Sequence, residues 1–265
     1  MLLKGAFKNK YKLMVFIIGL YITVDVLQHK GQTRILFPAA YPVTNATAGI
    51  PGNNKLINLE KNWKQAVNTV EKLNTINLNN SGFECDVYFN IQQDIFEVHH
   101  DPDKKTGTTL NDLLVRYQQK KLTASIWLDF KNLTDSNAIP ALKKLMHLQN
   151  NYNLKNKILV ESSRADLLTS FADSSFFTSY YTPMFNPYKI DDVEKVRWVD
   201  SIAAAIKNEK VNALSGYYFQ YPFLKHYFPG YKILTWAQTN KYSLVNLLFN
   251  KKLVSDKSIY IFLTP

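Results

Sequence analysis

Strand-like and helix-like segments alternate from about Lys55 to the end of this 265-residue chain. Such alternation over roughly two hundred residues is typical of α/β proteins, in which crossover helices join parallel strands. About eight strand-like segments can be distinguished, and eight strands are what a closed (β/α)₈ barrel requires. The sequence therefore predicts a TIM-like (β/α)₈ barrel over residues 55–265, preceded by an apolar N-terminal helix.

Composition supports a folded chain with a large core, because 46% of the residues are hydrophobic and 14% are aromatic. Cys85 is the only cysteine, which excludes a disulfide framework within one chain and a cysteine-rich zinc site. The net charge of +11 indicates anionic surroundings, although a solvated lysine-rich surface explains it as well. Without zinc-finger spacing, an RNP-like aromatic signature or a long basic helix, nucleic acid is not the expected partner.

Residues 1–28 have the pattern of a signal anchor. An apolar run, Leu13–Val24, follows four lysines and precedes Asp25. A positive flank before an apolar run indicates export or anchoring with the N-terminus inside. No small-x-small cleavage site follows, so we expect an uncleaved, single-pass anchor with the barrel outside the cytoplasm. The alternative is a buried core helix. Residues 29–54, with three prolines and three glycines, are expected to form a linker.

The strands are predicted where short apolar or alternating runs occur. These runs are Gly82–Asn90, Ile95–His100, Ser125–Lys131, Lys157–Ser162, Phe176–Thr182, Ala213–Tyr218, Tyr231–Gln238 and Ser258–Thr264. Between them lie four helical patterns, at residues 108–119, 137–152, 191–210 and 241–253. The first begins with a threonine cap and the second carries Pro140 in its first turn. The third begins with acids and ends with lysines, as the helix dipole favours.

Charged residues stand where a barrel strand normally carries valine or isoleucine. Glu84 and Asp86 are two positions apart in the run "GFECDVYFN", so on a strand they point to the same side. Asp129 and Lys131 repeat this spacing in "IWLDFKN". In a parallel barrel the carboxyl ends of the strands converge on one mouth. We therefore expect these side chains to meet there.

Other polar groups are predicted at the same mouth. His100 ends an extended segment, Glu161 ends "KILVES" and Trp236 lies in "ILTWAQ". His99 should point away from the mouth if His100 points into it. Trp236, together with Tyr180 and Tyr181, provides a floor for an apolar or sugar group, or is simply core.

The carboxylates Glu84, Asp86 and Asp129 suggest a site for a hard cation. Two like charges on one strand face repel each other, and burying them is costly unless they are paired or bound to metal. Ligation by oxygen alone fits Mg²⁺ or Ca²⁺ better than zinc. The alternative is an ion-paired network with Lys131 and Arg164.

Several short motifs resemble the PI-PLC-like phosphodiesterase superfamily, specifically its glycerophosphodiester phosphodiesterase branch and the related menorin-type domains. "ECDV" matches the acid-x-acid strand, "VHHDP" the second-histidine motif and "WLDFKNL" the acid-x-lysine strand. "ILTWAQTN" resembles the tryptophan strand near the end of those barrels, and "WKQAVNTVEKL" resembles their first motif. The resemblance covers about residues 55–265.

The resemblance implies a barrel in which a divalent cation binds the carboxylates and two histidines act as general base and acid. Carried over to this chain, it makes Glu84, Asp86 and Asp129 the metal ligands. His100 would be one catalytic histidine and Lys131 would neutralise phosphate oxygens. The remaining candidates are Asn68, Glu161 and Trp236, at which substrate would bind.

One position departs from the family pattern. Gln65 stands where the first histidine is expected, and glutamine cannot carry a proton at neutral pH. Together with the N-terminal anchor, the resemblance implies a membrane-anchored, metal-dependent phosphodiester hydrolase of the glycerophosphodiester phosphodiesterase type, and Gln65 predicts slow turnover. The alternative is a degenerate barrel that binds a phosphate-containing lipid or glycan without turnover; an envelope protein with a vestigial pocket is a weaker one.

Overall fold

The computed structural model describes residues 2–36, 40–57, 61–237 and 242–265. Predicted features on residues 1, 37–39, 58–60 and 238–241, which include the last position of the predicted strand Tyr231–Gln238, lie outside these ranges. The chain divides into two compact units. Residues 41–238 and 257–265 form one, here called the barrel unit, and residues 1–40 and 239–256 form the other, here called the helical unit.

Within the described ranges, eight parallel strands form a closed ring, because β1 pairs with both β2 and β9. The strands are β1 Trp63–Lys64, β2 Gly82–Asn90, β4 Ser125–Phe130, β5 Ile158–Ser162, β6 Phe177–Tyr181, β7 Ala213–Tyr217, β8 Lys232–Trp236 and β9 Ile259–Thr264. Most are buried along nearly their whole length, as expected for parallel strands that are covered on both faces. The predicted TIM-like barrel is confirmed.

One predicted strand lies outside the ring. The segment predicted as Ile95–His100 forms β3, Ile95–Val98, which pairs antiparallel with β2. A tight turn containing Asp94, at a φ of 51°, joins the two strands. The ring is completed instead by the two-residue β1, which is too short to show a hydrophobic period. The predicted count of eight was therefore right, but the membership was wrong.

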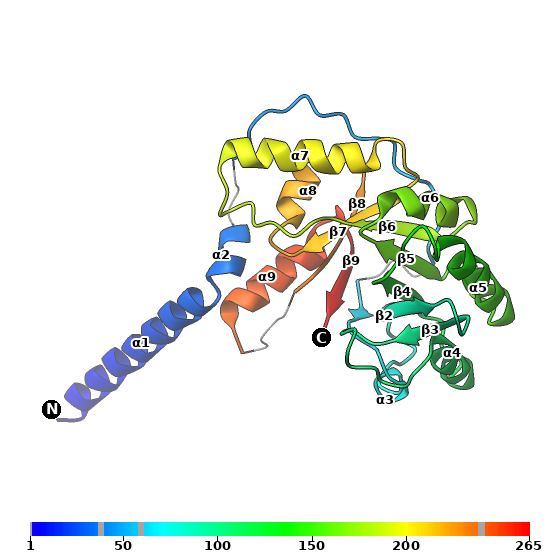
Figure 1. Ribbon diagram of the computed structural model, residues 1–265. Coiled ribbons are helices and arrows are strands. Elements are labelled where there is room, and N and C mark those ends of the chain that lie inside the picture. The colour runs from blue at the N-terminus through cyan, green and yellow to red at the C-terminus, as the bar shows by residue number, and fades with distance from the viewer. Residues whose placement is uncertain (1, 37–39, 58–60, 238–241) are drawn as a thin grey trace. The chain divides into compact units, whose positions relative to one another are not determined.

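Helices of the barrel unit cover the outside of the strands, as α4, α5 and α6 do in Figure 1. They are α3 Val70–Leu73, α4 Leu110–Gln119, α5 Ala138–Asn151, α6 Ala165–Asp173, α7 Asp192–Ile206 and α8 Tyr221–Tyr227. Local sequence fixes where several begin. Thr109 and Asp112 form a reciprocal capping box at the start of α4, and the side chain of Asp191 accepts the N–H of Glu194 at the start of α7.

Large apolar side chains fill the barrel interior. Trp63, Trp127, Phe177 and other residues of the inner faces form one buried cluster. The indole of Trp63 lies against the backbone of β2, at Gly82. A Cβ at position 82 would lie 2.3 Å from that ring, so only glycine fits here without displacing the indole.

The helical unit contains α1 Leu2–Gln28, α2 Lys30–Ile35 and α9 Leu244–Ser255. In α1, the stretch Lys10–Gln28 is long and apolar enough to cross a membrane, with a mean hydropathy of 1.5, and only 6% of it is buried. A signal sequence has the same properties.

Candidate functional site at the barrel mouth

Three carboxylates that the sequence predicted on two strands meet inside the barrel. Glu84 and Asp86 come from β2, and Asp129 comes from the neighbouring β4. One oxygen from each lies within 4.8 Å of the others. Oxygen ligands of one Mg²⁺ or Ca²⁺ ion have about this separation, because each lies ~2.0–2.6 Å from the metal. The residues therefore fit a hard divalent cation, both in donor type and in spacing.

Strand register brings a fourth acid to the same level. Asp86 is the partner of Asp129 across β2 and β4, and Asp129 is the partner of Glu161 across β4 and β5. Glu161 is buried, and its Oε2 has no hydrogen-bond partner within the described part of the chain. A buried carboxyl oxygen without a partner is costly, so Glu161 is available to a ligand at this mouth.

Lys131 contacts two of the three acids. Its Nζ lies 2.8 Å from Oδ1 of Asp86 and also forms an ion pair with Asp129. Partial burial of the ammonium lowers the pKa of Lys131, but the charges of Asp129 and Asp86 outweigh this and raise it. The lysine is therefore a permanent positive charge at the centre of the site. Arg164, the other expected partner, pairs instead with Asp135 and Asp166.

The loop after β1 holds the acids in place. The N–H of Ala66 donates to Oε2 of Glu84 at 2.6 Å, and Ala66 has a φ of 56°. The side chain of Asn68 donates to Oδ2 of Asp86 and accepts the backbone N–H of the same residue. Asn68 thus orients Asp86. Gln65 is half-buried directly before Ala66, where its N–H donates to Thr264 at the end of β9.

Burial and mutual repulsion perturb the acids. Desolvation, followed by the charges of Asp86 and Asp129, raises the pKa of Glu84 well above its ordinary value. The pKa of Asp129 is also raised, mainly by burial. The pKa of Glu161 is raised well above normal, by burial and then by Asp129. A bound cation would place positive charge beside these carboxyl groups and so favour their ionised forms.

The two histidines have different surroundings. The side chain of His100 is 69% exposed, and its Nδ1 lies 2.7 Å from Oδ1 of Asp101. Asp129 lies close enough to His100 for the imidazole to lower the pKa of that acid. His99 is buried, stacks on Tyr88 with ring centroids 4.3 Å apart, and lines a separate cavity of about 250 Å³. His100 is thus the more accessible histidine.

Aromatic side chains form one wall of the mouth. Trp236, at the end of β8, lies 5.0 Å from the ring of Tyr217 and 5.6 Å from that of Tyr181. Tyr217 and Tyr181 end β7 and β6, so all three belong to neighbouring strand ends. Sequence reasoning named Tyr181 and Trp236 but missed Tyr217, whose position at a strand end is the signal that marks it. Tyr180 is buried.

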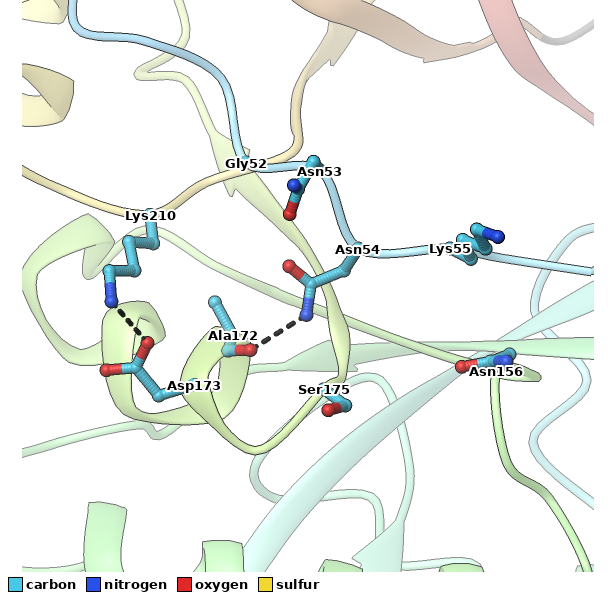
Figure 2. Close-up of a pocket in the computed structure, with 9 residues that line it drawn as sticks. All are labelled: Gly52, Asn53, Asn54, Lys55, Asn156, Ala172, Asp173, Ser175 and Lys210. Carbon is cyan, nitrogen blue, oxygen red and sulfur yellow. Dashed lines mark hydrogen bonds and ion pairs between the residues drawn. The ribbon is translucent and has the colours of Figure 1, made fainter.

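A second cavity, of about 450 Å³, lies at the opposite end of the strands. Its lining residues Asn156, Ser175 and Lys210 precede β5, β6 and β7 (Figure 2). There Asn54 donates to the carbonyl of Ala172, and Lys210 pairs with Asp173. These groups are satisfied by each other, and this end of a TIM barrel serves stability rather than chemistry.

Comparison with known proteins identifies solved structures that share this fold. No protein-family model matches the chain, and no curated protein matches it in sequence. Solved structures do match. A glycerophosphodiester phosphodiesterase from Parabacteroides distasonis is 14% identical, with a TM-score of 0.52 over 82% of this chain and 94% of the other. A glycerophosphoryl diester phosphodiesterase from Silicibacter pomeroyi is 11% identical, with a TM-score of 0.54 over 80% and 91%.

A third match is a phosphodiesterase from Oleispira antarctica, solved in complex with the product sn-glycerol-3-phosphate. It is 13% identical, with a TM-score of 0.50 over 78% of this chain and 93% of the other. These likenesses show the fold. The chain has the TIM-barrel architecture found in glycerophosphodiester phosphodiesterases, and it carries an acidic cluster inside that barrel.

Proposed function

We propose that this protein is a membrane-anchored, metal-dependent phosphodiester hydrolase that acts on glycerophosphodiesters or related lipid-derived headgroups. The single observation that carries the proposal is the convergence of Glu84, Asp86 and Asp129 to within 4.8 Å, with Lys131 between two of them. The fold supports it, since the solved structures of this architecture include phosphodiesterases, one of them with sn-glycerol-3-phosphate bound.

In this proposal Glu84, Asp86 and Asp129 hold a Mg²⁺ or Ca²⁺ ion. When bound, the ion supplies positive charge that stabilises the phosphate oxygens and lowers the pKa of an attacking hydroxyl. Asn68 and the N–H of Ala66 keep the carboxylates in position through the hydrogen bonds they donate. Lys131 meets a second phosphate oxygen with its ammonium group.

Cleavage of a phosphodiester requires a proton to leave the attacking hydroxyl and a proton to reach the departing alkoxide. His100 is assigned one of these transfers, because it is accessible and Asp101 orients its Nδ1. Gln65, half-buried at the end of β1, occupies the place of the other carrier but cannot transfer a proton. Slow turnover follows, since general acid–base help contributes roughly 10²–10⁴-fold.

The aromatic wall, defined as Tyr181, Tyr217 and Trp236, would contact the part of the substrate beyond the phosphate. Flat rings pack against the carbon face of glycerol or of a sugar, while the tyrosine hydroxyls can meet its hydroxyl groups. Glu161, with its unpartnered Oε2, would accept or donate a hydrogen bond to such a hydroxyl. A polyol ester therefore fits this mouth better than a purely apolar ester.

The test uses full-length protein in lipid nanodiscs with a panel of glycerophosphodiesters and either Mg²⁺ or Ca²⁺. We expect metal-dependent release of glycerol phosphate, which Glu84→Gln and His100→Ala abolish or strongly reduce. Matched controls are Asp94→Asn, an exposed acid at a positive φ that asparagine tolerates, and His147→Ala on the surface of α5. Folded protein that binds the cation but releases no product from any diester would refute the proposed hydrolysis.

A further inference from the structure

Helix α9, Leu244–Ser255, is apolar on two faces. Val245, Phe249 and Leu253 are buried. A second set, here called the α9 apolar face, remains exposed; it comprises Leu244, Leu247, Leu248 and Val254. Leu247 has 63% of its surface exposed. A helix that is hydrophobic all round is normally buried all round. We therefore expect another apolar surface to cover the α9 apolar face.

Hydrogen bonds fix the beginning of α9 to the C-terminal end of α1 within the helical unit. Oδ2 of Asp25 accepts the N–H of Val245 at 2.9 Å. Directly after α1, the ring of His29 lies 3.3 Å from Oγ of Ser243, the N-cap of α9. Tyr21 donates to the carbonyl of Tyr242.

These contacts set the depth of α9 if α1 spans a membrane. The stretch Lys10–Gln28 contains 19 residues, about 28 Å of helix, which is close to the ~30 Å of the hydrocarbon core. Asp25 then lies near the outer boundary of that core. Because Asp25 holds the first turn of α9, Leu244 and Leu248 must lie at the same boundary.

The charges beside the α9 apolar face suit an anionic surface. Lys251 is exposed and lies seven residues after Leu244, on the same side of the helix. Lys30 and Arg34 of the neighbouring α2 are also exposed. Apolar side chains flanked by cations are characteristic of helices that lie in the interface of a bilayer.

We infer that α9 is a second membrane contact: an interfacial helix whose apolar face inserts beside α1 into a bilayer that contains anionic lipid. The inference rests on the membrane anchoring included in the proposed function. It adds that the protein is held at two places, the spanning α1 and the surface-lying α9. Phospholipid, rather than a second copy of the chain, is the occupant, because α9 is hydrogen-bonded to the C-terminal end of α1, which itself exposes apolar side chains along its length.

The test places an environment-sensitive fluorophore on cysteines introduced into the full-length protein. Leu247→Cys reports on α9, Leu20→Cys reports on α1, and Ile139→Cys on the exposed surface of α5 is the aqueous control. Native Cys85 is buried, so the label goes to the introduced thiol. The protein is reconstituted in vesicles of phosphatidylcholine and phosphatidylglycerol, with and without brominated acyl chains.

We expect blue-shifted emission and quenching by brominated lipid at positions 20 and 247, and neither at position 139. Replacing Leu244 and Leu248 by glutamine in the Leu247→Cys protein should reduce its quenching without altering that of Leu20→Cys. Quenching at position 20 but not at 247 would overturn the inference while leaving the anchor intact. A blue shift at 247 without quenching would mean that protein covers α9, and would also overturn it. If position 20 shows no quenching, α1 does not enter the bilayer, and the inference fails together with the anchor. None of these outcomes bears on the hydrolysis assay, which tests the catalytic proposal separately.

Discussion

The ammonium of Lys131 lies 2.8 Å from Oδ1 of Asp86, and the same ammonium pairs with Asp129 near the end of β4, the strand that Lys131 directly follows. Two carboxylates from neighbouring strands therefore share one fixed positive charge. Glu84, the third acid, bonds instead to the backbone N–H of Ala66. One fixed positive charge thus faces three carboxyl groups, and a divalent cation would balance the negative charge that Lys131 leaves unpaired.

Cation binding should stabilise the folded protein. Because the cation binds the native acids and not the unfolded chain, a concentration of 100 times Kd contributes about 2.7 kcal/mol. For a protein of this size, that raises Tm by roughly 5–10 °C. We expect this shift with Mg²⁺ or Ca²⁺ in differential scanning fluorimetry, and its loss in Glu84→Gln. The Asp94→Asn control should keep it. An equal shift in both variants would place the binding elsewhere.

The metal-free protein should become less stable as pH rises through the range in which Glu84 ionises. Its raised native pKa means that the folded state holds a proton that the unfolded chain releases, so the free energy of unfolding falls with increasing pH. We expect wild-type protein to lose more stability than Glu84→Gln between about pH 5 and pH 7, a range above the ordinary glutamate pKa. Urea denaturation in the presence of a chelator measures both slopes. Parallel slopes would show that Glu84 ionises as easily in the folded state as in the unfolded chain.

Replacing Lys131 should expose the repulsion among the acids. Its side chain is 24% exposed, and breaking such a largely buried pair costs roughly 3 kcal/mol. We expect Lys131→Met to be destabilised by about this amount in metal-free protein, and added cation to restore part of the loss. Lys131→Arg keeps the charge and should lose less. Chemical denaturation with and without Mg²⁺ gives the comparison. If cation fails to rescue Lys131→Met, the lysine and the metal do not share the same acids.

Restoring a proton carrier at position 65 should raise turnover. Gln65 is half-buried beside Ala66, whose N–H contacts Glu84, so an imidazole there stands at the site. General acid–base help is worth roughly 10²–10⁴-fold, and we expect Gln65→His to increase kcat at least ~10-fold with little change in KM. Gln92→His, in the exposed β2–β3 turn, is the matched control. Unchanged kcat would indicate that another group already supplies this proton.

The contact between Gly82 and Trp63 should be sensitive to one added carbon. A Cβ at position 82 would lie 2.3 Å from the indole, and overpacking of this kind costs about 1–3 kcal/mol. Gly82→Ala should therefore lower Tm, whereas Gly230→Ala, where the nearest atom is 3.6 Å away, should not. Thermal unfolding of the two variants decides this. A stable Gly82→Ala protein would mean that the indole can move freely inside the barrel.

Local patterns determined most of the barrel. The strand predicted at Gly82–Asn90 is observed with the same bounds, because its apolar residues and small glycine start are a property of the segment itself. The threonine cap of α4 could also be predicted from the sequence, because a capping box involves residues only three positions apart. The antiparallel pairing of β3 with β2 could not be predicted, because the direction of a short strand depends on the turn at Asp94 and not on its own composition.

By itself, the sequence determined the fold class, the apolar N-terminal helix and the acids Glu84 and Asp86, since alternation and the two-residue period of a strand are local. The meeting of Asp129 with these two acids was also expected, but only the tertiary structure decided that Lys131 pairs with both Asp86 and Asp129, that Asn68 orients Asp86 and that Tyr217 stands beside Trp236. These relationships depend on strand register across a closed ring, and register is set by packing of the whole barrel rather than by any one segment.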